Sequence, residues 1–117
     1  MIIKYNNKKI QIPAKRIFSL GKMFGLMFKT KNTGNLLFDF DKKTRTPIHS
    51  VFVFFKFLAI WLDEKNNVLE LKVIRPFTPK IAPKKQFSRL IEVPFNNKNK
   101  RILNFFVDKK DLNSLHE

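Results

Sequence analysis

The chain has 117 residues, no cysteine and a formal net charge of +15, from 24 Lys and Arg against 9 Asp and Glu. A chain of this length is expected to fold as one domain, residues 1–117, with a real core. Without cysteine it has no disulfides, thiolate zinc sites or cysteine nucleophile. The charge predicts an anionic partner such as nucleic acid. Alternatively, the charged residues form only a solvated surface that keeps a protein with 14 Phe residues soluble.

Two short apolar segments open the chain, residues 2–5 and 9–12, on either side of Asn6 and Asn7. Asn tolerates the left-handed backbone of a tight turn, so these segments predict a β-hairpin. The N-terminus lacks a basic stretch followed by a long apolar one. We therefore expect no signal peptide, and the absence of cysteine fits a reducing compartment, so we expect a cytoplasmic protein.

The next segment, residues 15–23, carries Ile17, Phe18 and Leu20 among basic residues. That spacing predicts a short amphipathic helix ending near a glycine. Residues 36–40 alternate in polarity and predict a strand, which a charged turn over residues 41–47 follows.

The central stretch runs from residue 48 to residue 74. Residues 48–62 are almost wholly apolar and rich in Phe, Val and Ile, which predicts one long strand or two short ones buried on both faces. The run falls short of the roughly 18 residues that a membrane-spanning helix needs. Residues 63–67 form a polar turn, and residues 68–74 alternate as a half-buried strand does.

The C-terminal part begins with residues 75–85, whose three prolines predict an extended surface loop. A strand over residues 87–93 follows, and residues 102–107 could be a strand or a short helix. The count predicts a mainly β domain of six or seven strands and one short helix. An antiparallel β-sandwich or partly closed barrel buries such strands best.

A series of motifs in fixed order covers most of the chain, from about residue 15 to residue 108. The motifs are Gly25-Leu26-Met27-Phe28, Leu37-Phe38-Asp39-Phe40, Ile48-His49, Val53-Phe54-Phe55, Trp61-Leu62-Asp63, residues 68–71, Pro83-Lys84-Lys85 and Leu90-Ile91-Glu92-Val93-Pro94. In order and spacing the chain resembles the family catalogued as domain of unknown function 192, in its short cytoplasmic branch. The resemblance implies a small β-sandwich or barrel and implies no established activity.

The chain departs from that family in two places. After Val-Phe-Phe the family usually has proline, an apolar residue and aspartate, whereas this chain has Lys56-Phe57-Leu58. The family's later glycine-containing turn and glycine-aspartate are replaced by Asn96-Asn97 and Asp108-Lys109. If the missing aspartate serves a family function, this chain has lost it.

An enzyme mechanism cannot be assembled from the residues. His49 is the single histidine inside the fold, with Asp39, Asp41 and Asp63 as the nearest carboxylates in sequence. A metal site needs further ligands, and a lone histidine on an apolar strand is more often structural, so we expect no metal and no cofactor. An enzyme with a His49-carboxylate site stays as the least favoured alternative.

Two candidate sites remain. Gly25, Leu26 and Met27, with His49, could line a ligand groove, although Leu26 and Met27 are more simply core residues. The better lead is a basic cluster around the Pro-rich loop, with Phe77 and Phe87 interleaved as stacking residues if they are exposed. Its members are Arg75, Lys80, Lys84, Lys85 and Arg89.

The sequence therefore predicts a non-enzymatic binding or accessory module. The alternative is an RNA- or ribosome-associated protein that binds the phosphate backbone. Trp61 lies among apolar neighbours, so we expect it to be buried. A protein partner is not specified by any motif.

Overall fold

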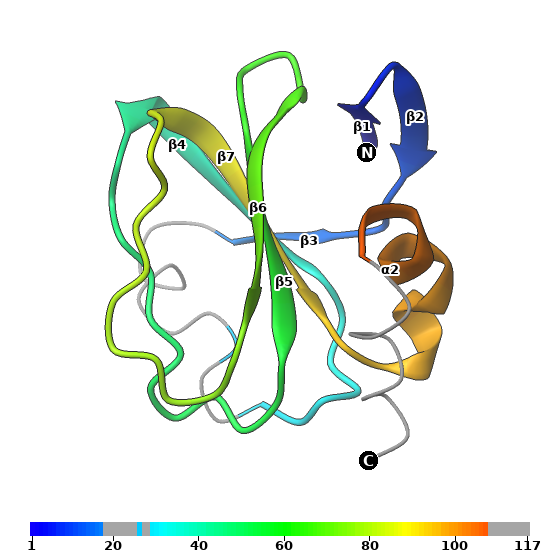
Figure 1. Cartoon of the computed structure of the whole chain (residues 1–117), viewed down its shortest axis with the longest axis vertical. Helices are drawn as coiled ribbons and strands as arrows, with labels where there is room; N and C mark the ends of the chain where they lie inside the picture. Colours follow the sequence, from blue (N-terminus) through cyan, green and yellow to red (C-terminus); the bar gives the residue numbers. More distant parts are fainter. Residues whose placement is uncertain (18–25, 27–28, 108–117) are drawn as a thin grey trace.

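The computed structural model describes residues 1–17, 26 and 29–107 and arranges their strands in two sheets (Figure 1). β1 (Ile2–Tyr5) and β2 (Lys8–Gln11) pair as an antiparallel hairpin, which confirms the prediction. Asn6 and Asn7 have φ angles of 50° and 63°, the left-handed conformation that a two-residue turn requires.

The larger sheet has five strands in the order β3-β4-β7-β5-β6. Its strands are β3 (Lys15–Ile17), β4 (Leu36–Thr44), β5 (Phe57–Leu62), β6 (Val68–Ile74) and β7 (Phe87–Pro94). β3 runs parallel to β4, and all other neighbours are antiparallel. β3 and β6 form the two edges, so the described strands do not close into a barrel.

A helical turn and a helix follow β7. The turn is η1 (Asn97–Asn99) and the helix is α2 (Lys100–Phe106). The Asn96 side chain starts the turn by accepting the backbone N–H of Asn99 at 3.0 Å. Residues 102–107, for which the sequence allowed a strand or a short helix, therefore lie mostly in a helix. With seven strands and one α-helix in the described residues, the mainly β prediction is confirmed.

The predicted helix over residues 15–23 is wrong in its described part. Lys15–Ile17 is strand β3, which pairs with Leu36 to Phe38 of β4. The backbone N–H of Lys15 donates to the Asn35 carbonyl at 2.9 Å. Pairing with a distant strand satisfies the backbone here, so it overrides the local amphipathic pattern. Residues 18–23 lie outside the described residues.

The apolar run over residues 48–62, which was predicted as one long strand or two short ones, is a strand only from Phe57 to Leu62. Ile48 makes an isolated bridge to Ile81, and residues 49–56 are irregular. Phe52 has a φ angle of 63°, which no extended strand accommodates. A strand over residues 36–40 is confirmed, but β4 continues to Thr44 through part of the expected charged turn.

β5 divides the core into two layers, because its side chains alternate between the faces of the sheet. Phe57, Ala59 and Trp61 belong to one cluster of buried residues, and Leu58, Ile60 and Leu62 belong to the other. All six residues of β5 are buried, so the expectation of burial on both faces is confirmed for this strand.

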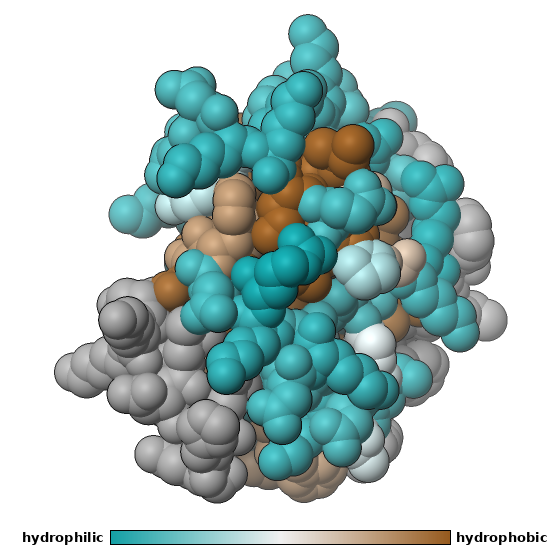
Figure 2. All heavy atoms as spheres, turned by 90° about the vertical axis from the view of Figure 1, so that its right-hand side faces the viewer, coloured by the Kyte–Doolittle hydropathy of each residue, from teal (hydrophilic) through white to brown (hydrophobic). Residues whose placement is uncertain are grey.

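The hairpin face of the sheet is covered by β1, β2 and α2, which lie together on the right in Figure 1. The covering side chains are Ile3, Ile10, Ile12, Ile102, Leu103 and Phe106. Figure 2 views the molecule from this side, where hydrophilic residues surround a smaller hydrophobic area. Ile2 of β1 is a large apolar residue that stays exposed.

The loop face is covered by irregular segments. Val53 and Phe55 come from the loop before β5, Ile81 from the loop before β7, and Leu26 from the segment before β4. These side chains bury Trp61, whose exposed fraction is 0%. The prediction for Trp61 is confirmed.

Candidate nucleic-acid interface

Two loops run side by side along one edge of the molecule (Figure 1). They are residues 45–56, between β4 and β5, and residues 75–86, between β6 and β7. The Ile48 and Ile81 backbones exchange two hydrogen bonds of 2.8 and 2.7 Å. We call the exposed Phe, Arg and Lys side chains of these loops the two-loop surface. Its members are Arg45, Phe52, Phe54, Arg75, Phe77, Lys80, Lys84 and Lys85.

Ser50 holds the two loops together from a fully buried position. Its Oγ donates to the Arg75 carbonyl and accepts the backbone N–H of Thr78, both at 2.6 Å. Its backbone carbonyl accepts the N–H of Phe77 at 2.8 Å. A buried hydroxyl with both partners satisfied fixes the geometry of the backbone around it. The conformation of residues 75–78 is therefore set by a residue of the other loop.

Three Phe residues of the two-loop surface point into solvent. Phe52, Phe54 and Phe77 are 47%, 60% and 56% exposed. The Phe54 and Phe77 rings meet edge to face, with centroids 5.4 Å apart. Phe87 is buried at 1% exposure and packs against Phe40 and Trp61. Of the two aromatic residues that the sequence singled out, Phe77 is thus available to a ligand and Phe87 is a core residue.

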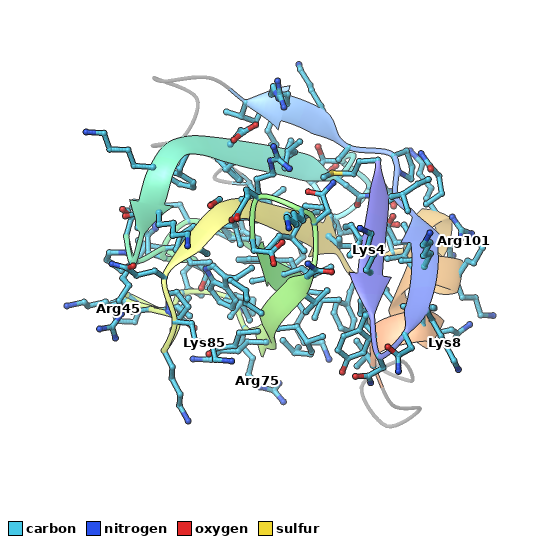
Figure 3. All side chains as sticks on the ribbon, turned by 90° about the horizontal axis from the view of Figure 1, so that it is seen from above. Lys4, Lys8, Arg45, Arg75, Lys85 and Arg101 are labelled. Carbon is cyan, nitrogen blue, oxygen red and sulfur yellow. The ribbon has the colours of Figure 1, made fainter. Side chains whose placement is uncertain are left out.

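Four of the five predicted anion-binding residues lie on the two-loop surface. Arg75, Lys80, Lys84 and Lys85 are exposed, and within the described residues none of them forms an ion pair. Figure 3 shows the labelled Arg75, Lys85 and Arg45 projecting outward on the same side of the molecule. Arg45, which the sequence analysis did not include, reaches the Pro83 carbonyl at 3.5 Å.

Arg89 does not belong to this group. Its Nη1 donates to the Glu64 carbonyl at 3.0 Å and to Asn66 Oδ1 at 2.7 Å. Its Nε lies 3.4 Å from Asp39, which also pairs with Arg16 at 2.8 Å. Strand register sets it opposite Leu62, so it points to the hairpin face.

The candidate groove is described only in part. Leu26 is 2% exposed and packs in the loop-face core, whereas Gly25 and Met27 lie outside the described residues. His49 is exposed, and no hydrogen bond or ion pair within the described ranges involves it. The same ranges contain no group of three or more His, Asp or Glu residues arranged to hold a metal ion.

A second basic region lies at the other end of the molecule, where Figure 3 labels Lys4, Lys8 and Arg101. Arg101 donates to the Gln11 carbonyl at 2.8 Å, and Lys98 to the Asn32 carbonyl at 3.2 Å. These contacts tie α2 and η1 to neighbouring segments. No described helix has the length and hydropathy to cross a membrane.

A shallow pocket of about 430 Å³ opens beside this second region. Lys15 and Lys98 line it together with Asn35, whose Nδ2 donates to the Pro13 carbonyl at 2.9 Å. The two ammonium groups make it another place where an anion could bind. Any test of the two-loop surface therefore needs a control that removes charge here.

Glu92 is a buried carboxyl group that the sequence analysis named only as part of a motif. It pairs with Leu36 on one side and Ala59 on the other, so it faces the loop-side core. Burial raises the pKa of Glu92 from 4.5 to about 8. The sequence signal for this buried carboxyl group was its position inside the apolar run from Leu90 to Val93.

Comparison with known proteins yields a fold and no family. No family model and no curated protein matches the sequence. A protein of unknown function from Novosphingobium aromaticivorans has a similar solved structure, with a TM-score of 0.70 at 11% identity over 86% of this chain and 74% of that one. A “putative transcription regulator” from Sinorhizobium meliloti reaches 0.69 at 11% identity, over 80% and 76%. At this identity the likeness concerns the fold alone.

Proposed function

We propose that this chain is a non-enzymatic module that binds nucleic acid through the two-loop surface. One observation carries the proposal. Arg75, Lys80, Lys84 and Lys85 are exposed together on two loops that hydrogen bonds hold side by side, and within the described residues none of their side chains forms an ion pair. Such a group of free cations binds a phosphate backbone by releasing its counterions.

The loops suit this role because they are already ordered. Three prolines and the Ser50 hydrogen bonds restrict residues 75–83, so binding would cost little conformational entropy. Arg75 would engage a phosphate with its planar fork, and the lysines would act as point charges. The fold likeness to a “putative transcription regulator” is compatible with a nucleic-acid partner.

We also propose that the chain is a member of the domain-of-unknown-function 192 family. The motif order supports this, and the motif residues Leu26, Trp61 and Glu92 are all buried, as shared core positions should be. Where the family has proline, an apolar residue and aspartate, Lys56 lies 4.8 Å from the Phe95 ring and Phe57 begins β5. A function that needs that aspartate is not expected in this chain.

The test compares two variants that lose the same charge. One replaces Arg75, Lys80, Lys84 and Lys85 with Gln, and the other replaces Lys4, Lys8, Lys9 and Lys15. Affinity for an oligonucleotide is measured by fluorescence anisotropy over a series of salt concentrations. For the loop variant we expect weaker binding and a flatter plot of log affinity against log salt, by about 0.7 to 0.9 per contact removed.

Thermal stability should stay almost unchanged in both variants, because exposed charges contribute little. Equal losses in the two variants would mean that binding follows net charge, and the two-loop surface would not be a site. Full binding by the loop variant would reject the proposed function outright.

A further inference from the structure

The aromatic residues of the two-loop surface carry a more specific inference than its charge. Phe52, Phe54 and Phe77 expose about half or more of their surface. Phe is ordinarily among the most buried residue types, and an exposed cluster of such side chains marks a binding surface. Ile2 is the only other large apolar residue among the described ones with comparable exposure, and it lies on the hairpin.

Backbone strain accompanies this exposure. Phe52 and Phe77 have φ angles of 63° and 60°, a region that bulky side chains rarely occupy. The hydrogen bonds that Ser50 makes to Arg75, Phe77 and Thr78, which we call the Ser50 latch, hold Phe77 in this conformation. Residues held in strained conformations by their surroundings cluster at functional sites. Here the strain orients an aromatic ring toward solvent.

The ring arrangement suits stacking with a flat ligand. Phe54 and Phe77 lie edge to face at 80°, so each ring orients the other while both remain more than half exposed. Arg75 lies two residues before Phe77, on the same latched segment, and its side chain is exposed. Aromatic faces beside unpaired cations match a ligand in which flat rings alternate with phosphates.

We propose that the two-loop surface binds single-stranded nucleic acid, stacking unpaired bases on Phe54 and Phe77 while Arg75 and its neighbouring lysines contact phosphates. This inference rests on the proposed function and narrows its ligand. In a duplex the base faces are stacked on one another and are not offered to a protein side chain, whereas a single strand can expose them.

The decisive probe is a pair of single strands with the same number of phosphates, one with bases and one abasic. Phe54→Ala combined with Phe77→Ala should weaken binding of the strand with bases by about 5- to 140-fold for each stacked base that is lost. The same variant should bind the abasic strand as the unmodified protein does. Ile2→Ala is the matched control and should change neither affinity.

Two further variants separate stacking from general apolar contact. Phe54→Leu with Phe77→Leu keeps apolar side chains and removes the rings, so it should lose nearly as much affinity as the Ala pair. Phe54→Tyr keeps a stacking ring and should retain binding. Circular dichroism and melting temperature check that each variant is folded. RNA and DNA strands of one sequence are titrated in parallel, because a 2′-hydroxyl contact would favour RNA.

Several results would overturn the inference. Equal losses on the base-containing and abasic strands would show that the rings act without the bases. Retained affinity in the Leu pair would assign the patch to apolar docking of another partner. Loss of binding to anionic phosphatidylglycerol vesicles, but not to the strand, would assign it to a lipid surface. In each case a selective loss by the variant with four loop cations replaced would leave the proposed function standing.

Discussion

The two faces of the large sheet are covered in different ways. On the hairpin face the cover is regular, from β1, β2 and α2, and Tyr5 packs against Phe105 and Phe106 at centroid distances of 6.4 and 5.3 Å. On the loop face the cover is irregular: two loops are joined by the Ile48–Ile81 hydrogen bonds and by the buried Ser50, and Leu26 comes from a third segment. Regular elements satisfy their own backbone groups, whereas loops depend on specific side chains for the same purpose.

Left-handed residues sharpen this difference. In the hairpin turn they are Asn6 and Asn7, which tolerate that conformation, whereas in the loops they are Phe52 and Phe77, which do not. Both ends of the molecule carry exposed cations (Figure 3). Exposed aromatic rings and backbone strain therefore distinguish the loop face from the hairpin face, whereas exposed cations do not.

The largest expected effect tests whether the two faces unfold as one unit. Trp61→Ala on the loop face should cost about 3–5 kcal/mol and Leu103→Ala on the hairpin face about 2–5 kcal/mol. Denaturant unfolding followed by circular dichroism measures both. Trp61→Phe is the control and should cost much less, because the indole Nε1 is buried without a hydrogen-bond partner. Separate unfolding transitions for the two faces would contradict a single cooperative core.

Glu92 predicts a pH dependence that originates under the loop face. Its pKa is raised to about 8 in the folded protein, so between 4.5 and 8 the folded state keeps a proton that the unfolded state has lost. Stability should therefore fall as pH rises through this window, by up to about 1.4 kcal/mol per pH unit. Glu92→Gln should remove that slope and be the more stable protein above pH 8. Parallel pH profiles for the two proteins would mean that the carboxyl is hydrated.

Ser50→Ala tests the latch between the loops. The variant removes the hydrogen bond of the Thr78 N–H and leaves the Arg75 carbonyl with Thr78 Oγ1 as its donor, so it should cost about 1–3 kcal/mol. Amide exchange should increase in residues 75–81 and stay unchanged in the hairpin. Ser88→Ala on β7 is a control, because Ser88 is also buried but is not part of the latch. If amide exchange in residues 75–81 is the same in the variant as in the unmodified protein, Ser50 does not hold the loops together.

The smallest effect concerns the strained ring of Phe77. Phe77→Ala and Phe77→Asn both remove the contact with Phe54, but Asn tolerates a φ angle of 60°. The Asn variant should therefore be the more stable of the two by about 1 kcal/mol. On the hairpin, Asn7→Ala should cost a similar amount, because Asn already suits that position. If Phe77→Ala and Phe77→Asn have the same melting temperature, the backbone at residue 77 is not strained.

Local patterns in the sequence determined much of the fold. The Asn6-Asn7 pair specified a hairpin, alternating polarity specified β6, and three prolines specified an irregular segment before β7. These features depend on the conformational preferences of neighbouring residues and on the period of the pleat, so one stretch of sequence contains them. Burial of Trp61 followed in the same way from its apolar neighbours.

Tertiary structure decided what distant segments do to one another. Lys15–Ile17 became a strand because β4 was available to pair with it. Arg89 does not join the basic cluster, because the strand register places its side chain against Asp39 and Asn66. The run Val-Phe-Val-Phe-Phe is apolar throughout, so only packing under the second loop selects Val53 and Phe55 for the core and leaves Phe52 and Phe54 in solvent. Whether an apolar side chain is exposed depends on which segments pack against it, and apolar composition by itself does not specify that packing.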